Sequence, residues 1–125
     1  MSEQLLQIDF NSDEAIYVQL YNQIVYGIAA RYYKNGDSLP SVRALADTIG
    51  INMHTVNKTY ALLRQDGLLH LDRRSGAVIS VDVEHEKGYQ DTRKEMNPII
   101  AKGVCKGLCK EDLHKMIDEI MENYE

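Results

Sequence analysis

The stretch GDSLPSVRALADTIGINMHTVNKTYALLRQDGLL, residues 36–69, decides the fold that the sequence predicts. Apolar residues recur at helical spacing over residues 41–49, on the face formed by Val42, Leu45, Ala46 and Ile49. They recur again over about residues 53–66, at Val56, Tyr60 and Leu63. Gly50 separates the two patterns, and a glycine commonly follows the end of a helix. A short helix, a tight turn and a longer helix predict a helix-turn-helix, whose second helix enters the major groove of DNA.

The polar positions of these two helices are the candidate DNA contacts. The side chains that precede each helix can cap it, and the second helix carries short polar groups opposite its apolar face. Such groups can reach base edges, and helix N-termini favour phosphate. An ordinary solvated helix face is the alternative for each of them. The candidates are Ser41, Arg43, Asn52, His54, Thr55, Asn57 and Lys58.

A β-hairpin is predicted after the second helix, with strands over residues 68–71 and 77–83. Its tip, residues 72–76, carries Arg73 and Arg74. A hairpin with basic residues at its tip that follows a helix-turn-helix is typical of a wing. Arginine at such a tip can bind phosphate or enter a narrow minor groove, although a tip arginine can equally serve only solubility.

The segment before residue 36 reads as an arm and one long helix. Residues 5–10 (LLQIDF) alternate weakly and predict a short strand or an extended arm. Asn11, Ser12 and Asp13 offer N-cap side chains for a helix over about residues 14–31. We expect its apolar stripe to lie in the core, at Ile16, Leu20, Ile24 and Ile28. This divides the chain into an arm (residues 1–12) and a winged domain (residues 13–81).

The remaining residues, 82–125, predict a helical tail. Residues 84–91 are polar and indicate a linker or a fraying helix start, and a helical pattern begins near Thr92. Pro98 should kink this helix or mark its true start. Gly107 ends it, and a final helix covers about residues 110–123. Its apolar stripe is too wide for so small a segment, so we expect part of it to face a second copy of the chain, with folding back onto the winged domain as the alternative. The predicted dimer residues are Ile100, Val104, Leu113, Ile117, Ile120 and Met121.

The charge distribution agrees with a nucleic-acid partner for the middle of the chain. The whole sequence of 125 residues has a net charge of −5. Residues 31–80, however, hold seven basic and four acidic residues, while the segments on both sides are net acidic. Binding responds to the local field more than to the total charge. No run approaches a membrane span or a signal peptide, which predicts a soluble cytoplasmic protein.

Metal, cofactor and catalytic sites are not predicted. Cys105 and Cys109 would share one face of a continuous helix, but a zinc site needs about four ligands. We interpret them as small apolar residues in a reducing compartment, with a thiol sensor as the alternative. The four histidines, His54, His70, His85 and His114, form no nucleophile and base cluster.

The sequence resembles the GntR family of bacterial transcription regulators over about residues 13–81. The matching pieces are AIYVQ from Ala15, GDSLPSVRALA from Gly36, TVNKTY from Thr55, and Gly67-Leu68-Leu69. The short helical tail is similar to that of the YtrA subfamily, whose members are dimeric regulators that often repress operons for ABC-type transporters.

The resemblance implies DNA contacts by Arg43, by the start of the recognition helix and by the wing glycine, Gly76. It also implies location in the bacterial cytoplasm, on the nucleoid when bound. Met53 stands where arginine is common, and the wing keeps one of two usual glycines and has Val78 in place of an aromatic residue. Ala15 stands where proline is common.

The predicted fold is therefore mainly α with a small β-hairpin: a winged helix-turn-helix followed by a helical dimerisation extension. The predicted function is sequence-specific binding of double-stranded DNA, as a homodimeric repressor on a pseudo-palindromic operator. The sequence identifies no small-molecule effector. A winged-helix module that binds proteins instead of DNA is the alternative, while an enzyme would need a partner chain.

Overall fold

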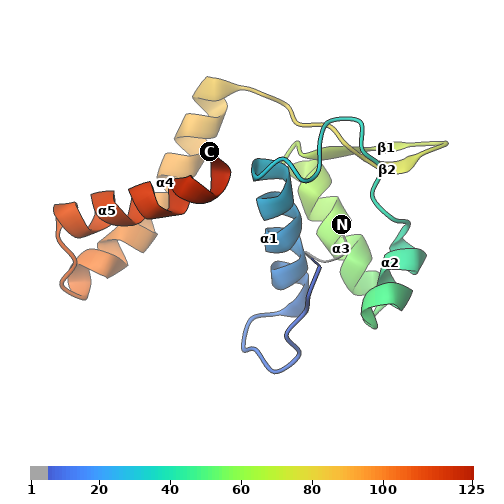
Figure 1. Ribbon diagram of the computed structural model, residues 1–125, viewed down its shortest axis with the longest axis horizontal. Helices are drawn as coiled ribbons and strands as arrows, with labels where there is room; N and C mark the ends of the chain where they lie inside the picture. The colour runs from blue at the N-terminus through green and yellow to red at the C-terminus, as the bar shows by residue number, and fades with distance from the viewer. Residues whose placement is uncertain (1–5) are drawn as a thin grey trace. The chain divides into compact units, whose positions relative to one another are not determined.

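The computed structural model describes residues 6–125, and it divides between Asp82 and Val83 into two compact units. In its described residues the first unit holds three helices and a two-stranded antiparallel sheet, and the second holds two helices and a short 3-10 turn (Figure 1). This confirms the predicted fold class. In chain order the elements are α1 (Ile16–Ala29), α2 (Val42–Ile49), α3 (Met53–Gln65), β1 (Leu69–Asp72), β2 (Gly76–Ile79), α4 (His85–Cys105), α5 (Lys110–Met121) and η2 (Glu122–Tyr124).

The core of the first unit forms from the apolar faces that the helical spacing predicted. Its fully buried aliphatic side chains come from α1, α3 and β2, and they are Leu20, Ile24, Val56, Leu63 and Ile79. Thr59 of α3 is buried among them. Its hydroxyl donates a hydrogen bond to the carbonyl oxygen of Thr55 at 3.0 Å, which satisfies the buried polar group.

Local capping defines the helix-turn-helix, as predicted. The Ser41 hydroxyl accepts a hydrogen bond from the amide of Ala44 at 3.1 Å, and the Asn52 side chain accepts one from the amide of His54 at 2.7 Å. Gly50 ends α2 with φ of 83°, in the left-handed region that glycine enters without a steric penalty. Each helix of the pair thus begins and ends where its own residues dictate.

The hairpin pairs Leu69 with Ile79 and Asp72 with Gly76. A third extended segment lies along β2, because the amide of Leu39 donates to the carbonyl of Ala77 at 2.8 Å and the amide of Ile79 donates to the carbonyl of Asp37 at 2.8 Å. The second strand is shorter than the predicted range of 77–83. Beyond Ile79 the amides of Ser80 and Asp82 still donate to the carbonyl oxygens of Leu68 at 3.1 Å and Gly67 at 2.9 Å, while the amide of Val81 between them donates to the Asn35 side chain at 3.0 Å.

The start of α1 differs from the prediction. The helix begins at Ile16 with Ala15 as its N-cap, and no side chain caps it, so the prediction of a cap from Asn11, Ser12 or Asp13 is wrong. The physical reason is a separate turn before the helix. The Ser12 hydroxyl accepts a hydrogen bond from the amide of Glu14 at 3.0 Å, two residues before the helix starts.

Residues 6–9 form an extended arm rather than a strand and a turn begins at Phe10, while Leu5 and the residues before it lie outside the described part of the chain. Two glutamines of α1 bind the arm through its backbone. The Gln19 side chain accepts from the amide of Asp9 at 2.9 Å and donates to the carbonyl of Asp9 at 3.1 Å. The Gln23 side chain accepts from the amide of Gln7 at 2.7 Å and donates to its carbonyl. The two amide groups therefore hold the arm as a neighbouring strand would.

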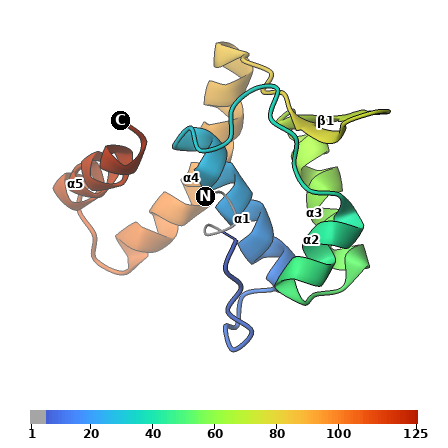
Figure 2. The same ribbon diagram turned by 45° about the vertical axis from the view of Figure 1, so that its right-hand side comes forward.

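In the second unit, α4 begins at His85, so the linker reading of residues 84–91 is wrong and the helical one is right. Side chains four residues apart support this first half, with an ion pair between Lys87 and Asp91 at 2.9 Å. Pro98 lies inside the helix, so it does not mark its start. The ribbon of α4 changes direction partway along its length (Figure 2).

The second unit buries none of its helical residues within the single chain. Its last helix, α5, begins after Cys109, whose amide donates to the Asp112 carboxylate at 2.9 Å, and it passes into η2 after Met121. Among the described helices, none has both the length and the apolar character needed to cross a bilayer.

Candidate nucleic-acid interface

The start of α2 presents an exposed arginine beside a capped helix terminus. Arg43 is the second residue of α2 and is exposed, as is its neighbour Ser41. The apolar side chains of the same helix, Leu45 and Ala46, are buried. Because the helix N-terminus carries a partial positive charge, an exposed arginine there adds to a local field that favours anions.

The first turns of α3 separate an inner from an outer face. Val56 is 0% exposed, whereas His54, Asn57 and Lys58 around it are exposed. Thr55 is half-buried, and its carbonyl oxygen accepts the hydrogen bond from Thr59. The predicted contact face is therefore open to solvent in this unit, apart from part of Thr55.

One of these residues has a partner that the sequence analysis missed. The ammonium nitrogen of Lys58 lies 3.8 Å from the centroid of the Tyr17 ring, within cation–π range. Tyr17 belongs to α1, so the contact connects the outer face of α3 to the first helix.

A hollow of about 490 Å³ lies where α2, α3 and β1 meet. In both views α2 and α3 lie side by side, with the hairpin near the C-terminal end of α3 (Figures 1 and 2). Of the α3 residues that line the hollow, only Asn57 is among the predicted DNA contacts. The hollow is lined by Val42, Asn57, Tyr60, Ala61, Arg64, Gln65 and Leu71.

The Asp72 side chain shapes the tip of the wing. Its carboxylate accepts hydrogen bonds from the amides of Arg74 at 2.7 Å and Ser75 at 3.0 Å. The hydrogen bond from the Ser75 amide, followed by that from the Arg74 amide, lowers the pKa of Asp72. The side chains of Arg73 and Arg74 are exposed, and Gly76 has φ of 74° with open space around its Cα.

Comparison with known proteins agrees with this arrangement of helix pair and wing. Residues 16–79 match the model of the family described as bacterial regulatory proteins, gntR family. The chain belongs to the GntR family. The HTH-type transcriptional repressor YtrA of Bacillus subtilis strain 168 is 33% identical over 119 residues, which cover 93% of this chain and 92% of YtrA.

Solved structures extend the similarity into the tail. The structure of YtrA from Sulfolobus acidocaldarius, a GntR-family transcription factor, is 34% identical with a TM-score of 0.68, and the match covers 81% of this chain and 98% of that one. A transcriptional antiterminator from Listeria monocytogenes EGD-e is 25% identical with a TM-score of 0.83, covering 95% of this chain and 92% of that one. This protein is thus a GntR-family transcription regulator with a DNA-binding helix-turn-helix, and its relatives are regulators rather than enzymes.

The tail of this GntR protein exposes most of the side chains predicted to form a dimer contact. Ile117 is 43% and Ile120 is 49% exposed, and Val104 and Met121 are exposed as well. Ile100 and Leu113 are half-buried. Burying an aliphatic side chain stabilises a protein by about 25 cal/mol per Å² of apolar surface removed from water, and an exposed side chain does not contribute this stabilisation. The unit therefore keeps apolar surface that the single chain does not cover.

The two cysteines of this GntR protein do not lie in one continuous helix, so they do not share a helix face. Cys105 ends α4 and Cys109 is the N-cap of α5, and both are exposed free thiols. The Cys109 thiol donates to the Asp112 carboxylate at 3.2 Å. Within residues 6–125, histidine, cysteine and acidic side chains form no cluster that could hold a metal ion.

Proposed function

We propose that this GntR protein is a repressor, which as a homodimer occupies a pseudo-palindromic operator and blocks a promoter. The observation that carries the proposal is the face of α3 on which His54, Asn57 and Lys58 are exposed above the fully buried Val56. A helix anchored by its inner side chains can present such a face rigidly to a major groove. The similarity to the repressor YtrA supports repression, and the YtrA-like tail suggests a transporter operon as target.

In this proposal the predicted residues divide into three contact groups. Ser41 and Arg43 at the start of α2 bind phosphate. The start of α3, with Lys58 and the neighbouring polar side chains Asn52, His54, Thr55 and Asn57, reads base edges. The wing residues Arg73 and Arg74 bind phosphate or the minor groove, while Gly76 allows close backbone approach. Residues 13–81 form the DNA-binding domain, preceded by the arm of residues 1–12.

The homodimer rests on the uncovered apolar side chains of residues 82–125. Pairing two copies through the face that holds Ile117 and Ile120 removes this surface from water, which stabilises the association. A two-fold dimer then presents two copies of α3. Recognition helices of such dimers enter half-sites about 34 Å apart, or one helical turn of DNA. The operator is therefore expected to be palindromic with that spacing.

The test begins with selection of DNA fragments that the protein binds from a random pool, followed by a salt titration of the best fragment. The logarithm of the affinity should fall linearly with the logarithm of salt concentration, because each neutralised phosphate releases counterions. Arg43→Ala should weaken binding by about 1–2 kcal/mol, and if Arg43 contacts phosphate it should reduce the salt slope by about 1.

Lys94→Ala is the matched control, since it removes one positive charge from the exposed surface of α4. It should leave both the affinity and the slope within error. Equal effects of Arg43→Ala and Lys94→Ala would show that only total charge matters and would remove Arg43 from the interface.

A protein-interaction module is the second candidate, because the net charge of the chain is −5. For this candidate the salt titration gives a different result. If no duplex binds at low ionic strength, or if the affinity does not change between low and moderate salt, the module replaces the repressor.

A further inference from the structure

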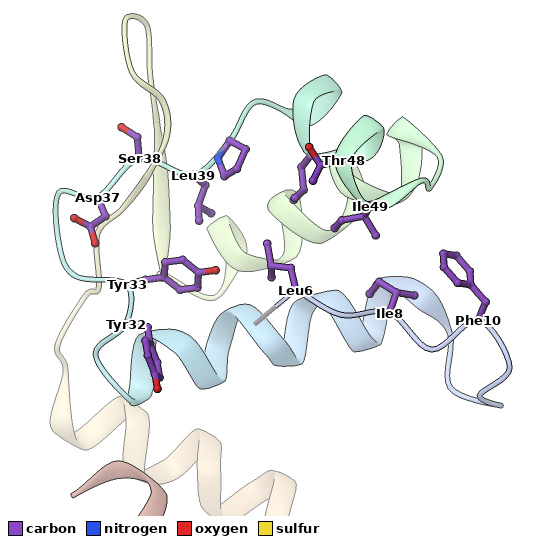
Figure 3. Close-up of a pocket in the computed structure, with 12 residues that line it drawn as sticks. Leu6, Ile8, Phe10, Tyr32, Tyr33, Asp37, Ser38, Leu39, Thr48 and Ile49 are labelled. Carbon is purple, nitrogen blue, oxygen red and sulfur yellow. The ribbon is translucent and has the colours of Figure 1, made fainter. Parts of the chain in front are cut away.

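A groove of about 690 Å³ lies in the first unit, and its described lining includes none of the proposed DNA contacts (Figure 3). Three segments form it: the arm, the loop that joins α1 to α2, and the second half of α2. Figure 3 shows the Tyr33 ring and Leu39 facing Leu6 of the arm across the groove. Sites for drug-sized molecules usually measure about 300–1,000 Å³, so the groove has the size of a small-molecule site.

The walls of the groove are apolar and fixed in place. Leu6 and Ile8 pack against the core from the arm side, while Leu39 and Leu45 on the opposite side are buried in it. The hydrogen bonds of Gln19 and Gln23 to the backbone of the arm hold the first wall against α1. A ligand would therefore enter a site that is largely formed before it binds, which lowers the entropic cost of binding.

The charge and the aromatic rings of the groove restrict the ligand further. Among the described residues that line it, Asp37 is the one with a charged side chain. The aromatic side chains at the two ends of the groove are well exposed, with Phe10 at 60% and Tyr32 at 63% (Figure 3). Aromatic faces attract cations, and a carboxylate adds to that attraction. The lining thus combines a long apolar floor with groups that favour positive charge.

We propose that this groove binds a lipophilic cation, an organic molecule with an apolar body and one delocalised or quaternary positive charge. The body lies along Leu6, Leu39 and Ile49, and the charge lies at the end of the groove where Asp37 lines it. The groove includes Thr48 and Ile49 of α2, so its occupant contacts the helix that carries Arg43. The binding itself does not depend on the repressor proposal, because it needs no DNA.

Isothermal titration calorimetry of the full chain without DNA tests the proposal, with tetraphenylphosphonium as the probe. Tetraphenylborate is the matched control, since the two ions have nearly the same shape and opposite charge. We expect tetraphenylphosphonium to bind one per chain and about tenfold more tightly than tetraphenylborate, because the anion loses the attraction to Asp37 and gains a repulsion. Equal affinities, or no binding of the cation, would overturn the proposal.

Three variants locate the site. In the wild type the amide of Lys34 donates to the Asp37 carboxylate at 2.8 Å, and Asp37→Asn keeps an acceptor for that amide. Asp37→Asn should weaken cation binding about fivefold, which is the effect of losing an exposed ion pair. Asp47→Asn removes the same charge from the exposed part of α2 outside the groove and should change the affinity less than twofold. Thr48→Trp places a bulky side chain in the groove and should abolish binding. A loss that is the same for Asp37→Asn and Asp47→Asn, or full binding by Thr48→Trp, places the cation elsewhere and refutes the site.

Discussion

The hydroxyl of Tyr60 connects the recognition helix to the entrance of α2, and its removal is the sharpest test of how the helix-turn-helix is held. Tyr60 is 4% exposed, and its hydroxyl donates to the carbonyl oxygen of Pro40 at 2.8 Å. Tyr60→Phe deletes this bond and leaves the ring in place. Water can reach the freed carbonyl because Pro40 is exposed, so the cost at pH 7 should be about 1 kcal/mol. That corresponds to a melting temperature about 4–8 °C lower for a domain of this size.

The pH dependence of the stability difference between wild type and Tyr60→Phe gives a second test. Burial, followed by the neighbouring Tyr33, raises the pKa of Tyr60 far above its ordinary value. A raised folded pKa means that the contribution of the phenol is fully present below the unfolded pKa of about 10 and is lost as the pH rises above it. Between the unfolded and the folded pKa, the free energy of unfolding of the wild type should fall by about 1.4 kcal/mol per pH unit because of Tyr60 alone, whereas that of Tyr60→Phe shows no such decrease. The wild-type advantage should therefore vanish near about pH 10.7 and reverse by about pH 11.

Thermal unfolding followed by circular dichroism from pH 7 to pH 11 measures this difference. Tyr26→Phe is the control, because Tyr26 is an exposed tyrosine of the same unit, and its free energy of unfolding should stay within about 0.5 kcal/mol of wild type at every pH. A Tyr60→Phe deficit that stays constant up to pH 11 would show that the phenol ionises equally in both states. The reasoning from burial would then be wrong.

The remaining predictions concern the arm, the turn and the tail. Gln19→Glu removes the donors to the carbonyl oxygens of Asp9 and Glu14 and should cost about 2 kcal/mol at pH 7 in urea unfolding. Burial raises the folded pKa of the introduced carboxyl, so the deficit should shrink as the pH falls through that pKa and stop changing below the unfolded pKa of about 4.3. Gln7→Glu on the exposed arm should show neither effect. Gly50→Ala should lower stability by about 1–2 kcal/mol through its positive φ alone, since nothing else crowds that position, and an unchanged urea midpoint would contradict this. Ile117→Asp with Ile120→Asp should give a monomer in sedimentation equilibrium with helical content retained, and a persistent dimer would exclude this face from the contact.

Much of the helix-turn-helix could be predicted from the sequence because its determinants are local. Ser41 and Asn52 cap their helices within three residues of themselves, and Gly50 ends α2 through its own backbone freedom. The spacing of Val56, Tyr60 and Leu63 alone assigned the inner face of α3, and all three are buried. The outward direction of His54 and Lys58 follows from the same periodicity.

The start of α4 was harder to predict because its first half has no apolar stripe. Residues 84–91 show pairs such as Lys87 and Asp91 instead, and each such pair contributes only about 0.2–0.5 kcal/mol to a helix. The sequence also could not distinguish a kink at Pro98 inside the helix from a helix start at Pro98, because the surrounding residues are the same for both alternatives. Periodicity, the main signal in the sequence, was missing here.

The sequence by itself determined the helix pair, its caps and the polar face of α3, since these depend on residues within a few positions of one another. Only the tertiary structure decided which distant groups meet. It turned the amides of Gln19 and Gln23 toward the arm, placed Lys58 over Tyr17 and enclosed the groove that ends at Asp37. A side chain can reach several partners from one backbone position, and the packing of the whole unit selects among them.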